Sequence, residues 1–148
     1  MNIGIIGYGM VGKAITQAFT ELGHIVEVYD IKLPDTKLED ILHTELCYIC
    51  VPTQPSPTGA CDITNVEDVV RLLAVNNYTG TIAIKSTVTP GTTVNLGKKY
   101  NIDKICHVPE FLRERCGYLD FTEHHNVLIV GTENLTSYDQ VVKSHGKY

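Results

Sequence analysis

The amino-acid sequence predicts an α/β fold, in which helices cover both faces of a doubly wound parallel sheet of six strands. Short apolar runs alternate with amphipathic helical patterns from one end of the chain to the other. The runs are rich in β-branched residues and mostly uninterrupted, which is typical of strands buried on both faces. The 148 residues are enough for one domain with its own core and too few for two, so we expect a single domain over 1–148.

The first strand and the first helix have the clearest patterns. Asn2–Ile6 is dominated by apolar residues and predicts a buried strand. Residues 10–22 carry apolar side chains at spacings of three and four, which places them on one face of a helix, and Gly23 ends that helix. Further apolar runs predict the remaining strands, at 25–30, 46–51, 81–85, 105–108 and 127–130.

The intervening segments predict helices and one rigid loop. Thr36 with Glu39, and Thr64 with Glu67, have the spacing of a capping box and predict two helix starts. Residues 52–59 contain three prolines and a glycine, so we expect a stiff loop without regular structure there. Other helices are expected at 92–99, within 109–120 and at 135–142, and the tail at 143–148 is expected to fray.

A glycine-rich segment connects the first strand to the first helix and has the pattern GxGxxG. Gly7 permits the tight turn, Gly9 leaves room for a pyrophosphate to approach the backbone, and Gly12 lets the helix pack closely on the strand. A pyrophosphate would then lie at the helix N-terminus, where the helix dipole favours negative charge. The cofactor-binding residues expected in this segment are Gly7, Tyr8, Gly9, Met10, Val11 and Gly12.

Asp30 ends the second predicted strand, 18 residues after Gly12, where an acid can accept hydrogen bonds from the ribose of a dinucleotide. A carboxylate would repel a 2′-phosphate, and Lys32 is the only cation that follows closely. The sequence therefore predicts a Rossmann-like domain that binds NAD rather than NADP. The glycine pattern by itself leaves FAD open.

Three further segments follow predicted strands at the edge of the sheet where such folds bind ligands: CVPT at 50–53, KSTVTPGT at 85–92 and PEFLRE at 109–114. Together with the glycine segment, they make residues 1–131 resemble the N-terminal NAD-binding domain of the UDP-glucose/GDP-mannose dehydrogenase family. Members of this family oxidise the C6 alcohol of a nucleotide sugar to a carboxylate, in two hydride transfers to NAD through a cysteine-bound thioester.

The resemblance implies a role for each matching residue. Thr87 and Glu110 are the catalytic residues it implies, with Glu110 positioning a water molecule during hydrolysis. The residues implied to line the cofactor cleft are Val51, Pro52, Thr53, Ser86 and Thr87, the last two on the nicotinamide side. The residues implied to face the sugar are Phe111, Leu112, Arg113 and Glu114.

The chain also departs from the family pattern. Only 16 residues separate Asp30 from Cys47, so one unit at the edge of the sheet is expected to be absent. Val108 and Arg115 stand where the family usually has asparagine and glycine. The family's interdomain helix, with its lysine and asparagine, and its nucleophilic cysteine have no counterpart here. Cys116 is the only thiol expected near the substrate loop, and we expect it to be a packed or mobile residue.

Composition restricts the partners. The net charge of −5 and the low Lys+Arg content argue against nucleic acid, and no apolar run approaches the roughly 20 residues that span a bilayer. The five cysteines are scattered through apolar segments, which favours reduced intracellular thiols over disulfides or a metal site. We therefore expect a cytoplasmic protein with no nucleic-acid, membrane or metal partner, which forms a homo-oligomer through exposed apolar surface.

Three functions stay open at this stage. The first is the cofactor half of a UDP-glucose 6-dehydrogenase-like oxidoreductase that needs a second chain to supply the thiol and the sugar pocket. The second is a non-catalytic NAD-binding sensor or regulatory module. The third is a small β-hydroxyacid-type or imine-type dehydrogenase, which would share the glycine segment but leave the loop at 109–114 unexplained.

Overall fold

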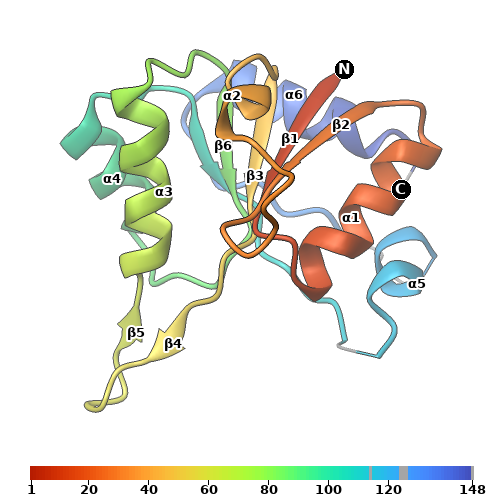
Figure 1. Ribbon diagram of the computed structural model, residues 1–148. Helices are drawn as coiled ribbons and strands as arrows, with labels where there is room; N and C mark the ends of the chain where they lie inside the picture. Colours follow the sequence, from red (N-terminus) through yellow and green to blue (C-terminus); the bar gives the residue numbers. More distant parts are fainter. Residues whose placement is uncertain (114, 124–126, 148) are drawn as a thin grey trace.

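A parallel sheet lies at the centre of the fold (Figure 1). The structure, a computed structural model, describes residues 1–113, 115–123 and 127–147, and within them this sheet has five strands. The strands lie in the order β2 (Ile25–Tyr29), β1 (Asn2–Ile6), β3 (Leu46–Ile49), β6 (Thr81–Ile84) and β7 (Ile105–His107). The order reverses between β1 and β3, because the chain first winds outward to β2 and then returns past β1.

Helices cover both faces of the sheet, as Figure 1 shows. One face carries α1 (Met10–Glu21), α5 (Gly117–Thr122) and α6 (Leu135–His145), and the other carries α2 (Leu38–Ile41), α3 (Thr64–Val75) and α4 (Thr92–Tyr100). Successive side chains of β3 pack on opposite faces of the sheet. Leu46 and Tyr48 belong to the apolar cluster with α1 and α6. Cys47 and Ile49 belong to the cluster with α3 and α4. The predicted doubly wound α/β fold is confirmed. No helix in the described ranges is long and apolar enough to cross a membrane.

The prediction of a sixth strand at 127–130 is wrong. These residues are described without strand pairing, and Gly131, which follows them, forms an isolated antiparallel bridge with His107. Two backbone hydrogen bonds of 2.9 and 2.8 Å make this bridge. Val127 and Ile129 instead line a cavity and stay partly open to solvent. An apolar run alone does not distinguish a strand from a cavity wall.

The proline-rich loop contains regular structure, contrary to the prediction for 52–59. The two-residue strands β4 (Gln54–Pro55) and β5 (Cys61–Asp62) pair in antiparallel fashion and form a hairpin that projects from the body of the domain (Figure 1). Gly59, at φ +82°, helps to close its turn. Proline is tolerated in such a strand because the hairpin has only edge strands.

Neither predicted capping box forms. Helix α2 begins after Lys37, and the Thr36 hydroxyl donates a hydrogen bond to Leu33 O instead. Helix α3 begins at Thr64 itself, whose backbone N–H and hydroxyl both donate to Asp62 Oδ1, over 2.9 and 2.5 Å. Asp62, two residues before Thr64, therefore accepts the hydrogen bonds at the start of α3, whereas the spacing predicted Thr64 as the capping residue.

The C-terminal helix is longer than predicted. Helix α6 runs to His145, so the expectation that the chain frays from 143 is wrong as far as that residue. Ser144 and His145 are buried against the sheet. The Tyr48 hydroxyl lies 2.7 Å from Ser144 Oγ, which fixes the last turn of the helix to β3.

Candidate functional site

The candidate residues gather at the carboxyl edge of the sheet. They follow β1, β2, β3, β6 and β7 in turn, and parallel strands place all these ends on one side. The strand order reverses between β1 and β3, and a crevice beside such a reversal is the usual ligand site of open α/β sheets.

The glycine turn leaves a free space beside the backbone. Gly7 has φ +95°, and a Cβ there would lie 2.8 Å from the backbone of Cys50. A Cβ on Gly12 would lie 2.1 Å from Gly7 O, so helix and turn are in close contact. A Cβ on Gly9 would meet nothing within 4 Å. The space beside Gly9 therefore lies open at the start of α1, where the helix dipole favours a negative charge.

Asp30 is tied to the glycine turn. Its Oδ2 accepts the backbone N–H of Tyr8 over 2.7 Å, and its Oδ1 accepts that of Lys32 over 2.8 Å. These hydrogen bonds lower the pKa of Asp30 below its ordinary value, because they stabilise the carboxylate. The backbone N–H of Asp30 in turn donates to the Thr36 hydroxyl over 3.1 Å. Thr36 therefore helps to hold the backbone at Asp30, a role that its capping-box spacing does not indicate.

The segments after β3 and β6 are linked to each other. Ser86 Oγ donates to Val51 O over 2.7 Å, and the backbone N–H groups of Lys85 and Ser86 both donate to Ile49 O. Pro52 O accepts a hydrogen bond from the Asn65 side chain. The hydrogen bond from Ser86 brings Ser86 and Val51 together, and Pro52 and Thr53 come next along the chain. Thr87 follows as an exposed residue, and its carbonyl lies 3.5 Å from the Cys61 thiol.

A cavity of about 370 Å³ lies beside the loop that follows β7. Glu110, Phe111, Leu112 and Arg113 all line it, so the structure brings these predicted residues together. Glu114 lies outside the described residues. The Asp120 carboxylate accepts two hydrogen bonds from the Arg113 guanidinium, over 2.6 and 3.0 Å. It also accepts the Arg113 backbone N–H. This pairing raises the pKa of Arg113.

Two residues at this cavity were missed as functional candidates. Lys85 is buried there, and its Nζ lies 2.8 Å from Glu110 Oε2. His145 also lines the cavity from the end of α6. The one available signal was a lysine directly after three apolar strand residues, at the start of the segment 85–92.

The described thiols differ in burial. Burial raises the pKa of Cys50 and Cys106 to about 12 and raises that of Cys47 further, so these thiols are protonated near neutral pH. Cys61 and Cys116 are partly exposed. Cys116 lies directly before α5, and its backbone N–H donates to Arg113 O. Within the part of the chain that the structure describes, no group of three or more His, Cys, Asp or Glu residues could hold a metal ion.

Comparison with known proteins gives one consistent family. The NAD binding domain of the UDP-glucose/GDP-mannose dehydrogenase family matches residues 32–145. The chain is 27 % identical to UDP-glucose 6-dehydrogenase AglM of Haloferax volcanii, over 97 % of this chain and 44 % of that protein. It is 28 % identical to GDP-mannose 6-dehydrogenase of Pseudomonas aeruginosa, over 74 % of this chain and 27 % of that protein. The chain spans less than half the length of these relatives.

Solved structures show the same fold. A UDP-glucose dehydrogenase from Pyrobaculum islandicum superposes with a TM-score of 0.85 at 22 % identity, over 97 % of this chain and 43 % of that one. A ternary complex of GDP-mannose dehydrogenase from Pseudomonas aeruginosa gives a TM-score of 0.80 at 22 % identity, over 98 % and 44 %. An imine reductase from Myxococcus stipitatus is more distant, with a TM-score of 0.71 at 12 % identity over 97 % and 51 %. At these identities the likeness concerns the fold alone.

Proposed function

The chain belongs to the UDP-glucose/GDP-mannose dehydrogenase family, and from this premise we propose that it is the cofactor half of an oxidoreductase that acts on a nucleotide sugar. It is an NAD-binding domain, and NAD is its cofactor. The observation that supports this proposal is that three features lie at strand ends on the same edge of the sheet. They are the opening beside Gly9, the Asp30 carboxylate and the cavity at Glu110.

The proposed roles at the cofactor follow from the geometry of the turn. Gly9 admits the pyrophosphate to the backbone at the start of α1, together with its neighbours in the segment 7–12. Asp30 is already ionised and accepts the ribose hydroxyls. Val51, Pro52 and Thr53 line the cleft, and Ser86 and Thr87 approach the nicotinamide side.

The proposed roles at the substrate centre on the cavity. NAD supplies the hydride acceptor when it is bound. Thr87, which is exposed after β6, is proposed to act at the reacting carbon, and Glu110 is proposed to position a water molecule for hydrolysis. Phe111 and Leu112 face the sugar, and Arg113 is held in a fixed orientation by Asp120. Glu114, which lies outside the described residues, is proposed to act with them.

We propose that a second chain covers this cavity and supplies the nucleophilic thiol. The support is the apolar rim of the cavity, where Phe111 is 65 %, Val127 60 % and Ile129 46 % exposed. Such an exposed rim is typical of a surface that another chain covers. We also propose that the protein forms a homo-oligomer and that it is cytoplasmic. Size-exclusion chromatography with light scattering tests the oligomer.

Titration calorimetry and an oxidation assay test the proposal together. We expect the isolated chain to bind NAD more tightly than NADP, with no binding of FAD. With NAD and UDP-glucose it should form no NADH above background, because a thioester needs a placed thiolate. Addition of a chain that carries the nucleophilic thiol and the sugar pocket should start NADH production. NADH formed by the isolated chain would contradict the need for a partner, and failure to bind NAD would contradict the whole proposal.

A non-catalytic NAD-binding module is the second candidate. The observation that favours it is the burial of Cys47 and Cys106, which keeps these two thiols protonated. NAD binding that no nucleotide sugar affects, with or without a partner chain, would support this module. A β-hydroxyacid-type or imine-type dehydrogenase has only the shared fold in its favour, at 12 % identity.

A further inference from the structure

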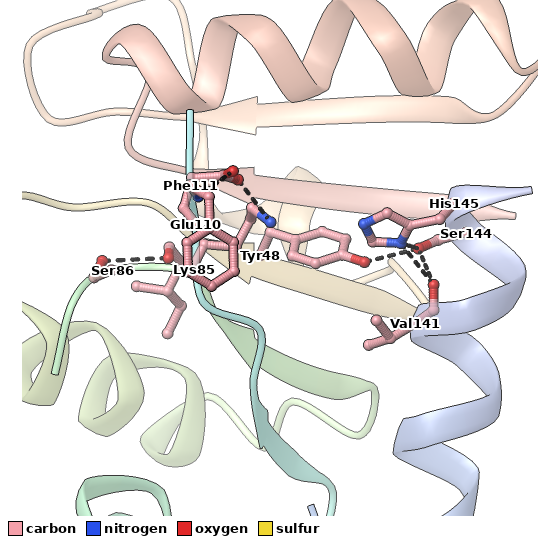
Figure 2. A network of polar contacts seen from close by, with 9 residues as sticks. Tyr48, Lys85, Ser86, Glu110, Phe111, Val141, Ser144 and His145 are labelled. Carbon is pink, nitrogen blue, oxygen red and sulfur yellow. Dashed lines mark hydrogen bonds and ion pairs between the residues drawn. The ribbon is translucent and has the colours of Figure 1, made fainter. Parts of the chain in front are cut away.

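A buried ion pair lies behind the loop that follows β7. Lys85 Nζ and Glu110 Oε2 are 2.8 Å apart, and the two side chains are only 2 % and 14 % exposed (Figure 2). Lys85 directly follows β6 and Glu110 follows β7, so the pairing of these neighbouring strands brings the two groups together. A buried charge is costly unless it is paired, so each group strongly favours the presence of the other.

Two aromatic rings hold the ammonium in place. Lys85 Nζ lies 5.7 Å from the centre of the Tyr48 ring and 5.6 Å from that of Phe121, which are favourable cation–π distances. The Tyr48 ring is itself fixed, because its hydroxyl contacts Ser144 Oγ over 2.7 Å and the Ser144 hydroxyl reaches Val141 O (Figure 2). A row of contacts therefore runs from the end of α6 through Tyr48 to Lys85 and Glu110.

Both oxygens of the Glu110 carboxylate are engaged. Oε2 faces the Lys85 ammonium, and Oε1 accepts the backbone N–H of Phe111 over 2.9 Å. Oε2 is buried and accepts no hydrogen bond from the described residues, so its contact with Lys85 is an ion pair. The ion pair and the hydrogen bond act on different oxygens and together restrict rotation of the carboxylate. The Phe111 contact is local to the loop, so among the described residues the contact with Lys85 is the one that relates the carboxylate to the sheet.

We propose that Lys85 is the positioning residue of Glu110: its buried ammonium anchors the carboxylate at the wall of the cavity, in the orientation needed to hold a water molecule there. In this proposal Lys85 acts through Glu110. The inference rests on the proposed function in one respect, which is that Glu110 positions a water molecule. The anchoring is a property of this chain and can be measured without cofactor or partner.

Carbon NMR of the carboxyl groups tests the anchoring. The full chain is labelled with ¹³C-glutamate, and the Glu110 carboxyl resonance is identified as the one that disappears in Glu110→Gln. We expect this resonance to move toward the position of exposed glutamates in Lys85→Met, which removes the charge but keeps an unbranched side chain. Lys85→Arg should return it toward the wild-type position. Lys98→Met is the matched control at an exposed lysine and should leave it unchanged.

The reciprocal measurement covers the case in which Lys85→Met does not fold. The Lys85 ammonium is followed by ¹⁵N NMR in the wild type and in Glu110→Gln, and loss of the carboxylate should shift its resonance and speed its hydrogen exchange. A Glu110 resonance that ignores Lys85→Met, or a Lys85 resonance that ignores Glu110→Gln, overturns the inference. Failure of the chain to bind NAD would overturn the proposed function and leave these readouts untouched.

Discussion

The Asp30 carboxylate accepts the backbone N–H of Tyr8 over 2.7 Å, and this hydrogen bond joins the end of β2 to the glycine turn after β1. The acid and the turn therefore form one unit. The second carboxylate oxygen accepts the N–H of Lys32, so both oxygens are oriented before any ribose arrives. Such preorganisation lowers the cost of binding.

We predict that Asp30→Asn weakens NAD binding by about tenfold to a hundredfold, since a hydrogen bond to a charged group contributes about 1.5–3 kcal/mol. Asparagine keeps one acceptor but loses the charge that the Tyr8 and Lys32 N–H groups stabilise. Discrimination against NADP should shrink as well, because the repulsion of a 2′-phosphate is gone. Calorimetric titration with both cofactors measures this. Asp35→Asn, at an exposed acid nearby, is the control, and equal NAD affinity of the two variants would refute the role of Asp30.

The two glycines of the turn should respond to alanine in opposite ways. At Gly9, with φ −77°, a Cβ would meet nothing within 4 Å, so Gly9→Ala should change the free energy of unfolding by less than about 0.5 kcal/mol. It should nevertheless weaken NAD binding by about tenfold or more, a loss of about 1.4 kcal/mol, because the methyl group occupies the space of the pyrophosphate.

Gly12→Ala is the counterpart, since its Cβ would lie 2.1 Å from Gly7 O. Overpacking of this kind costs about 1–3 kcal/mol of stability. Urea unfolding and NAD titration of both variants separate the two effects. Unchanged NAD binding in Gly9→Ala would mean that the cofactor does not approach the turn.

Local patterns in the sequence predict the parts of this fold that depend on nearby residues. The strand at Asn2–Ile6 has the predicted bounds, and the glycine turn and Asp30 fall at the expected strand ends. Helix starts were harder, because a capping side chain competes with its neighbours. Asp62 precedes Thr64 by two residues and accepts both its backbone N–H and its hydroxyl, which no spacing rule for Thr64 and Glu67 anticipates.

The rest depends on contacts between distant segments. The ion pair of Lys85 and Glu110 exists because β6 and β7 are neighbours in the sheet, and the sequence alone does not give that order. Residues 127–130 have the composition of a strand, yet Val127 and Ile129 line a cavity. The polar residues at the end of α6 resemble a solvated tail, but Ser144 is buried because it meets the hydroxyl of Tyr48.

His107 should make the stability of the chain depend on pH. Burial lowers the pKa of His107 below its ordinary value of 6.5, so the folded state favours the neutral ring. The unfolded chain takes up the proton at a higher pH, so this contribution to stability is complete above about pH 6.5 and is lost as the pH falls through the folded pKa. Urea unfolding at pH 7.5, 6.5 and 5.5 should give a shallower decline for His107→Gln than for the wild type. The exposed His43 provides the control in His43→Gln, and identical slopes for all three proteins would contradict the prediction.

The contact between Tyr48 and Ser144 should couple the end of α6 to the core. Ser144→Ala leaves the fully buried Tyr48 hydroxyl without this partner and should cost about 1–3 kcal/mol, the desolvation penalty of such a group. Tyr48→Phe removes that hydroxyl, so Ser144→Ala should cost less in its background, and the double-mutant cycle should give a coupling of at least about 0.5 kcal/mol. Urea unfolding measures all four proteins. Tyr138→Phe, at a half-exposed tyrosine of the same helix, should change stability by less than about 0.5 kcal/mol. Additive effects of the two substitutions would show that residues 144–145 pack on the sheet without the hydrogen bond contributing.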